Sequence, residues 1–174
     1  MKLLQISLSV LFILCTTVGY SADEQQAANK IYDAEWSKEE AYTSKTDTES
    51  GRDYAVSVKD MTLNSLNTYY TANGNNQPYQ DALAKYNEGR DLIIEATSDY
   101  ATQLIHLSEA NGDLTLAKGY FEDSEWTAAF FKAIDAWNGF DGFVDLTTGT
   151  FGCVNKYYES VNKFGQAQQI INNN

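Results

Sequence analysis

The sequence has few of the residues that cross-link or interrupt a chain. Among its 174 residues there are two cysteines, one proline and one histidine. Cys15 lies in an apolar N-terminal segment, so Cys153 is the only cysteine in the rest of the chain. A framework of intramolecular disulfides is therefore excluded there, and the fold has to be held together by its core.

The unpaired Cys153 leaves two alternatives. In a secreted protein, an odd cysteine either joins two chains through an intermolecular disulfide or is buried as a small apolar residue. We expect a buried thiol, with a homodimer linked through Cys153 as the alternative.

Patterns of catalytic and cofactor-binding residues are also missing. The sequence contains no Gly-x-Ser-x-Gly, no P-loop and no Gly-x-Gly-x-x-Gly. One histidine and one cysteine do not complete a zinc site without carboxylates, and no EF-hand spacing occurs. We interpret His106 as a histidine at the surface or at the boundary of the core, and we expect no enzyme activity, no catalytic residues, no metal site and no cofactor.

Positive charge is scarce as well. The chain has 12 lysines and arginines against 24 aspartates and glutamates, a formal net charge of −12 at pH 7. The acidic residues are spread along the chain and do not form a tail. Such a surface repels nucleic acids and anionic membranes, so we expect neither as a partner of the mature protein.

The first 21 residues have the pattern of a secretory signal peptide. Lys2 is followed by an uncharged, largely apolar run over residues 3–18, and Gly19 and Ser21 stand at the −3 and −1 positions of a cleavage site. The run is short for a bilayer-spanning helix, which needs about 20 apolar residues. We expect cleavage after Ser21, secretion to the extracellular space, one domain over residues 22–171 and a frayed tail over 172–174.

Apolar residues after this segment recur at steps of three and four, which is typical of amphipathic helices. On the first predicted helix, the apolar side includes Ile31, Tyr32, Trp36 and Ala41. The first three helices are expected over residues 24–44, 53–72 and 78–110, with a polar break between the first two over 46–51. A short helix is expected after Asp113. A further helix follows it, capped by Asp123 or Ser124. The last helix covers about 142–171, or begins near Cys153 if residues 147–152 form a loop.

Three Asn-Gly pairs indicate helix ends, because glycine after the last helical residue adopts a left-handed conformation without strain. They are Asn73-Gly74, Asn111-Gly112 and Asn138-Gly139. Short connections make consecutive helices pack antiparallel. The sequence therefore predicts an all-α fold, an up-and-down antiparallel bundle of four or five helices.

The chain is rich in aromatic residues, with 12 tyrosines, eight phenylalanines and three tryptophans. Tyr86 and Tyr100 share one helix face and are candidates for lining a ligand-holding interior. Exposed Trp36 or Trp126 beside other apolar groups would instead indicate a protein partner. We expect a secreted, acidic bundle that acts through protein–protein interaction, as an inhibitor, an effector or a matrix or secretion component. The alternative is a carrier of a small apolar or aromatic ligand held between the helices.

Overall fold

The computed structural model describes residues 21–149 and 152–174. These residues form four helices: α2 (Glu24–Asn73), α3 (Gln77–Glu122), α4 (Trp126–Thr148) and α5 (Cys153–Asn172). No residue in the two described ranges lies in a strand, so the predicted all-α class is confirmed. None of these helices is long and apolar enough to span a membrane. Apart from Ser21, the predicted signal peptide lies outside the described residues.

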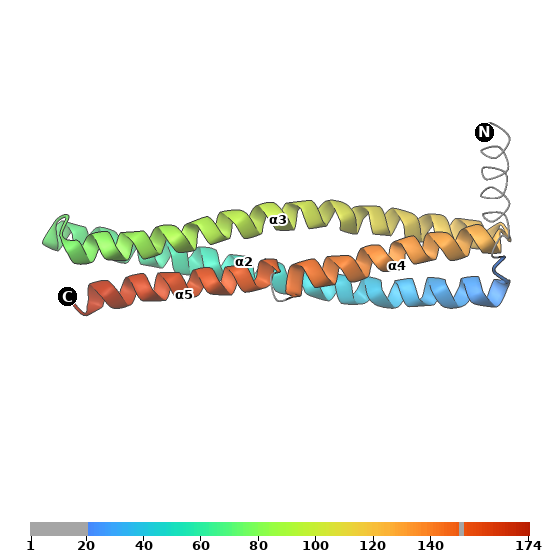
Figure 1. The fold of residues 1–174 in the computed structure, drawn as a ribbon, viewed down its shortest axis with the longest axis horizontal. Coiled ribbons are helices and arrows are strands. Elements are labelled where there is room, and N and C mark those ends of the chain that lie inside the picture. Colours follow the sequence, from blue (N-terminus) through green and yellow to red (C-terminus); the bar gives the residue numbers. More distant parts are fainter. Residues whose placement is uncertain (1–20, 150–151) are drawn as a thin grey trace, which may run out of the picture.

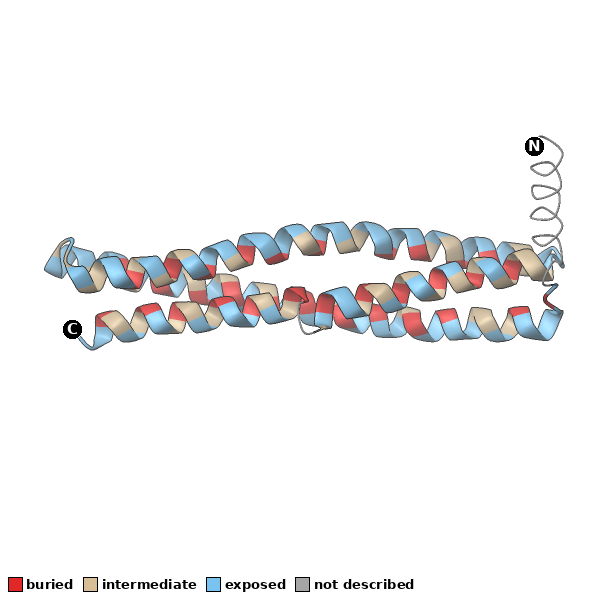
Figure 2. Cartoon of the chain, viewed as in Figure 1, coloured by how far each residue is buried: buried red, intermediate tan, exposed pale blue. Residues whose placement is uncertain are grey.

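The helices make an elongated bundle of three rods, in which α3 runs antiparallel to the other two (Figure 1). α2 runs along the bundle, α3 returns beside it, and α4 and α5 follow each other in the direction of α2 to form the third rod. α4 and α5 each pack against both long helices and scarcely touch one another. With a rise of about 1.5 Å per residue, the 50-residue α2 is about 75 Å long. The core is therefore a narrow column, visible as the buried inner faces of the rods (Figure 2).

A seven-residue repeat builds this column. Along α3, the core-facing residues follow one another at alternating steps of four and three, and large side chains alternate with small ones, except that the partly buried Gln103 stands between Tyr100 and Leu107. The large ones are Tyr79, Tyr86, Ile93, Tyr100, Leu107 and Leu114, and the small ones are Ala82, Gly89, Ala96, Ala110 and Ala117. Such a repeat is typical of left-handed coiled-coil packing, and the small residues let the rods approach closely.

The core face of α2 is made mostly of small and hydroxyl-bearing residues, with Val58 and Leu66 as its larger apolar side chains. Thr48 Oγ1 donates to the Ser44 carbonyl at 2.7 Å, and Thr62 Oγ1 donates to the Val58 carbonyl at 2.8 Å. Ser44 Oγ also lies 2.5 Å from Thr147 Oγ1 of α4, so a hydrogen bond links the two rods. Because these buried hydroxyls have partners, they are compatible with a continuous helix in the core.

The predicted break over residues 46–51 is therefore wrong, and α2 continues through it to Asn73. Thr48 and Gly51 are core residues there, not residues of a loop. A Cβ added to Gly51 would lie 3.9 Å from Tyr157 Cβ, which places this part of α2 against α5.

Only the first of the three Asn-Gly pairs ends a helix in the described structure. Gly74 has φ 71°, and its N–H donates to the Tyr70 carbonyl at 2.7 Å. Gly112 and Gly139 instead lie inside α3 and α4. A Cβ on Gly139 would meet Ala110 Cβ at 2.8 Å, so this glycine brings α4 close to α3. The segments that were predicted as separate helices on the two sides of residues 111–112 form one helix, α3. The segments on the two sides of residues 138–139 likewise both belong to α4.

Of the other predicted helix ends, the start of α3 is confirmed, whereas the start of α4 and the extent of the last helix are wrong. Asn76 caps α3 by accepting from the Tyr79 N–H at 3.0 Å, with Pro78 in the first turn as expected. The N-cap of α4 is Glu125, not Asp123 or Ser124. A helix running unbroken over residues 142–171 is wrong, because α4 ends at Thr148 and α5 begins at Cys153, as the loop alternative predicted.

Candidate functional site

Tyr86 and Tyr100, the two tyrosines predicted as ligand contacts, are core residues. Their exposed fractions are 7% and 3%. The Tyr86 ring packs against Phe164 with centroids 5.5 Å apart, and the Tyr100 hydroxyl donates to Glu49 Oε1 at 3.2 Å. Burial, together with the charge of the nearby Glu49 carboxylate, raises the pKa of Tyr100. Both rings therefore fill the space between the rods.

The two predicted tryptophans lie apart from these tyrosines and from each other along the sequence. Trp126 begins α4, where its half-buried ring packs against Phe121 at a centroid distance of 5.0 Å. Trp36 is 62% exposed on α2, and its Nε1–H donates to Glu40 Oε1 at 3.2 Å. Trp36 is therefore the most exposed of the four predicted contact residues, whereas Trp126 is partly covered at the end of the bundle.

This exposure corrects the predicted apolar side of the first helix. Tyr32 and Trp36 were assigned to the core face, but Tyr32 is 65% exposed. The residues that do face the core are smaller: Ala27, Ala34, Ser37, Ala41 and Ser44. From Ala34 onward, these core residues recur every three or four positions in the sequence. The prediction missed them because it followed hydrophobicity, which does not identify Ser37 and Ser44 as core residues.

A groove of about 560 Å³ lies between α2 and α4 beside this tryptophan, and we call it the Trp36 groove. Trp36 forms part of its wall, and Val144 and Thr148 contribute from α4. The other lining residues, all from α2, are Glu39, Glu40, Thr43, Ser44 and Asp47. Among the described residues that line the groove, the charged side chains are three carboxylates, and none is a lysine or an arginine.

Such a lining suits a cation carried on an apolar stem. The face of an indole ring attracts an ammonium or guanidinium group within about 6 Å of its centroid. Carboxylates strengthen that attraction, and apolar wall atoms can cover the methylene stem of a lysine or arginine. The lining of the Trp36 groove is therefore suited to cationic side chains.

The hollow on the other side of Trp36 has a different electrostatic character. It measures about 320 Å³ and lies between α2 and α3, with Tyr32 and Leu114 in its lining. Lys118 Nζ lies 2.7 Å from Glu35 Oε1 there, so this carboxylate already has a cationic partner. The excess negative charge next to Trp36 therefore lies on the α4 side.

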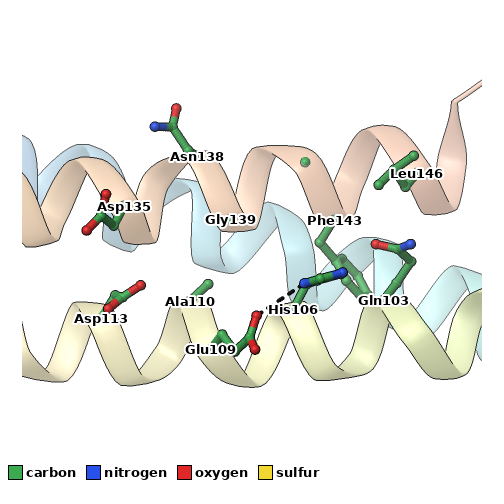
Figure 3. Close-up of a pocket in the computed structure, with 11 residues that line it drawn as sticks. Gln103, His106, Glu109, Ala110, Asp113, Asp135, Asn138, Gly139, Phe143 and Leu146 are labelled. Atoms are coloured by element: carbon green, nitrogen blue, oxygen red, sulfur yellow. Dashed lines mark hydrogen bonds and ion pairs between the residues drawn. The ribbon is translucent and has the colours of Figure 1, made fainter.

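A third groove, of about 300 Å³, lies between α3 and α4, and we call it the His106 groove (Figure 3). His106 Nδ1 lies 3.2 Å from Glu109 Oε2 at its edge. Lys132 Nζ donates to both Asp113 and Asp135, at 2.9 and 3.0 Å. Among the described residues, Gln103 Oε1 is a buried side-chain oxygen without a hydrogen-bond partner, and Gln103 lines this groove.

Cys153, the predicted thiol, is 1% exposed at the start of α5. Its Sγ lies 3.8 Å from the carbonyl oxygen of Leu146, and burial raises the pKa of the thiol. This environment favours the buried-thiol interpretation, because a disulfide to another chain would require the first turn of α5 to move. The homodimer through Cys153 stays a prediction.

Over the two described ranges, no group of three or more histidine, cysteine, aspartate or glutamate residues could hold a metal ion.

No protein-family model matches the chain, and comparisons with curated proteins and with solved structures gave no significant match. The function therefore has to be inferred from the geometry and charge of the surface.

Proposed function

We propose that the protein is a secreted, non-enzymatic binding protein that holds a basic segment of a partner protein in the Trp36 groove. The observation that carries this proposal is an indole with 62% of its surface exposed, beside three carboxylates and no lining cation. Isolated exposed apolar residues are common on soluble proteins, but a tryptophan in the wall of a groove of uniform charge is typical of a recognition surface.

The scaffold supports binding because it holds the groove in place. Ser44 lines the groove and is hydrogen-bonded across the core to Thr147 of α4, so the two helices that form the groove are joined directly below it. A preformed groove loses little conformational freedom when a partner binds. The net charge of −12 also attracts basic partners over a distance and speeds their association at low salt.

Secretion is part of the proposal and is supported by the N-terminal pattern together with the start of the bundle. Asp23, two residues after the predicted cleavage site, caps α2 by accepting from the Gln26 N–H at 2.8 Å. The Gln26 side chain accepts from the Asp23 N–H at 3.0 Å, which completes a capping box. Cleavage after Ser21 would therefore leave the first helix with its cap intact.

Replacing Trp36 with alanine should weaken binding of a basic peptide by about tenfold or more, because the indole is the main apolar surface of the groove. The probe is a fluorescein-labelled peptide of alternating lysine and leucine, followed by fluorescence anisotropy with the chain that begins at Ala22. A peptide of alternating glutamate and leucine should not bind.

Tyr54→Ala is the matched control, since Tyr54 is a 54% exposed aromatic residue on the same helix outside the groove. This variant should bind the basic peptide as the unchanged protein does. Equal affinities for all three proteins would rule out the Trp36 groove as the site. Tight uptake of an uncharged apolar probe, with no response to the basic peptide, would favour the ligand-carrier alternative.

A further inference from the structure

Ala22, the first residue after the predicted cleavage site, contacts the start of α4. Its backbone N–H donates to Thr127 Oγ1 at 3.1 Å, a hydrogen bond between residues 105 positions apart in the sequence. Asp23, the next residue, caps α2, and Thr127 lies in the first turn of α4. The bond therefore ties the first rod to the third at the end of the bundle where both begin (Figure 1).

The segments that meet at this end of the bundle contain carboxylates but no lysine or arginine. Residues 21–29 lead into α2, and residues 119–131 join the end of α3 to the start of α4; together they have five acidic residues, Asp23, Glu24, Glu122, Asp123 and Glu125. None of the five forms an ion pair with another described residue. The last turn of α3, which has the negative end of its helix dipole, also lacks a basic residue. A cation at this end of the bundle would therefore be favoured.

Cleavage after Ser21 would supply such a cation. Hydrolysis of the Ser21–Ala22 bond by water leaves a carboxylate on Ser21 and an α-ammonium on Ala22, which has three N–H donors in place of one. The ordinary pKa of an α-amino group is about 7.7 to 8.0, so the group is mostly protonated at neutral pH. Ser21, Ala22, Glu125 and Thr127 all line one surface hollow of about 530 Å³. The new ammonium therefore forms beside a hydroxyl and a carboxylate that can bind it.

We propose that the α-ammonium of Ala22 locks the mature bundle by donating to the Thr127 hydroxyl and pairing with the Glu125 carboxylate. This inference rests on the secretion part of the proposed function and adds to it, because removal of the signal peptide completes a contact between the first and third rods. Glu125 is suited to this role, since its exposed side chain makes no capping hydrogen bond on α4. Together with Asp23, it also offsets the positive ends of the α2 and α4 dipoles.

The lock depends on pH in a defined direction. The charged side chains around the ammonium are the five carboxylates, from α2, from the end of α3 and from the start of α4. An ammonium that pairs with a carboxylate in the folded protein loses its proton at a higher pH than it does in the unfolded chain. The stabilisation is therefore complete below the pKa of the amine in the unfolded chain, and it is lost as the pH rises through the pKa in the folded protein.

The test compares the chain that begins at Ala22 with the same chain acetylated at its N-terminus, which keeps one N–H but removes the charge. At about pH 6, the acetylated chain should have a melting temperature about 2 to 4 °C lower, and at about pH 10 the two melting temperatures should coincide. Trp126 lines the same hollow. Its ring protons, followed by nuclear magnetic resonance, should therefore shift as the free amine titrates and stay in place in the acetylated chain.

Glu125→Gln identifies the partner of the ammonium, and Glu122→Gln is its matched control. Both substitutions remove one carboxylate from the same end of the bundle, but Glu122 does not line the hollow. The loss of melting temperature on acetylation should largely disappear in Glu125→Gln and persist in Glu122→Gln.

Equal melting temperatures of the free and acetylated chains at about pH 6 would overturn the lock. So would an effect of acetylation that is as large in Glu125→Gln as in the unchanged chain, or a secreted protein whose first residue, determined by mass spectrometry, is not Ala22. The Trp36 groove begins about 20 Å away along α2, so acetylation should leave binding of the lysine–leucine peptide unchanged. A failed lock with normal peptide binding thus leaves the binding function standing, and failed peptide binding leaves the lock standing.

Discussion

Replacing Gly89 with leucine should lower the free energy of unfolding by about 3 kcal/mol, because α3 and α5 touch at this residue. A Cβ on Gly89 would lie 2.7 Å from Phe164 Cε1 and 2.9 Å from the Ser160 carbonyl oxygen. The ring can turn, but the carbonyl belongs to the backbone of α5, so the helix itself must move. Urea denaturation followed by circular dichroism measures the loss.

Gly112→Leu is the control in the same helix. A Cβ on Gly112 meets nothing within 4 Å, so leucine should keep its advantage in helix propensity and stabilise the protein by about 0.5 to 1 kcal/mol. The two variants should therefore change stability in opposite directions. A Gly89 variant as stable as the Gly112 variant would contradict the close contact between α3 and α5.

Phe140→Ala should destabilise the bundle by about 3 to 5 kcal/mol, as is usual when a buried phenylalanine leaves a cavity. Phe140 is 0% exposed and belongs to the core cluster of the bundle. Because the core is a narrow column between three rods, few neighbouring side chains can move in to fill the space. For a chain of this size, the melting temperature should fall by about 10 °C, as measured by thermal unfolding.

Phe131→Ala removes the same ring from the same helix at a residue that is 48% exposed. It should cost about 1 kcal/mol or less, because much of that ring is in water in the folded protein. Similar losses from the two alanine variants would show that the face of α4 containing Phe140 is not the core face.

The parts of the fold that depend on local chemistry could be predicted from the sequence. Gly74 ends α2 with a positive φ of 71°, Pro78 lies in the first turn of α3, and the loop near residues 147–152 was one of the two alternatives for the last helix. Each of these features follows from the conformational preferences of a few neighbouring residues.

The parts that depend on packing between distant segments could not be predicted in this way. Gly51 and Gly139 resemble helix breakers in the sequence, yet each lies within a helix at a contact with another rod. Whether a glycine ends a helix or allows a close contact depends on the partner helix, which is a separate segment of the sequence. Local propensity therefore divided α2 and α4 into pieces that tertiary packing joins.

The candidate site was predictable only in part, for the same reason. Trp36 was identified as a contact residue, but it was also assigned to the core side of its helix. The bundle buries the small residues Ala34, Ser37 and Ala41 instead, and this arrangement leaves the indole in water beside Glu40. The contribution of Val144 and Thr148 to the groove depends on how α4 packs along α2, which no local motif indicates.

The central claim is that a basic partner binds beside Trp36, and nuclear magnetic resonance of the three indole N–H groups tests it most directly. The tryptophans are Trp36, Trp126 and Trp137, so titration of the ¹⁵N-labelled protein with the lysine–leucine peptide should follow three signals. Our account predicts that the Trp36 signal shifts to saturation while the Trp126 and Trp137 signals stay in place. A stationary Trp36 signal in the presence of bound peptide would contradict it.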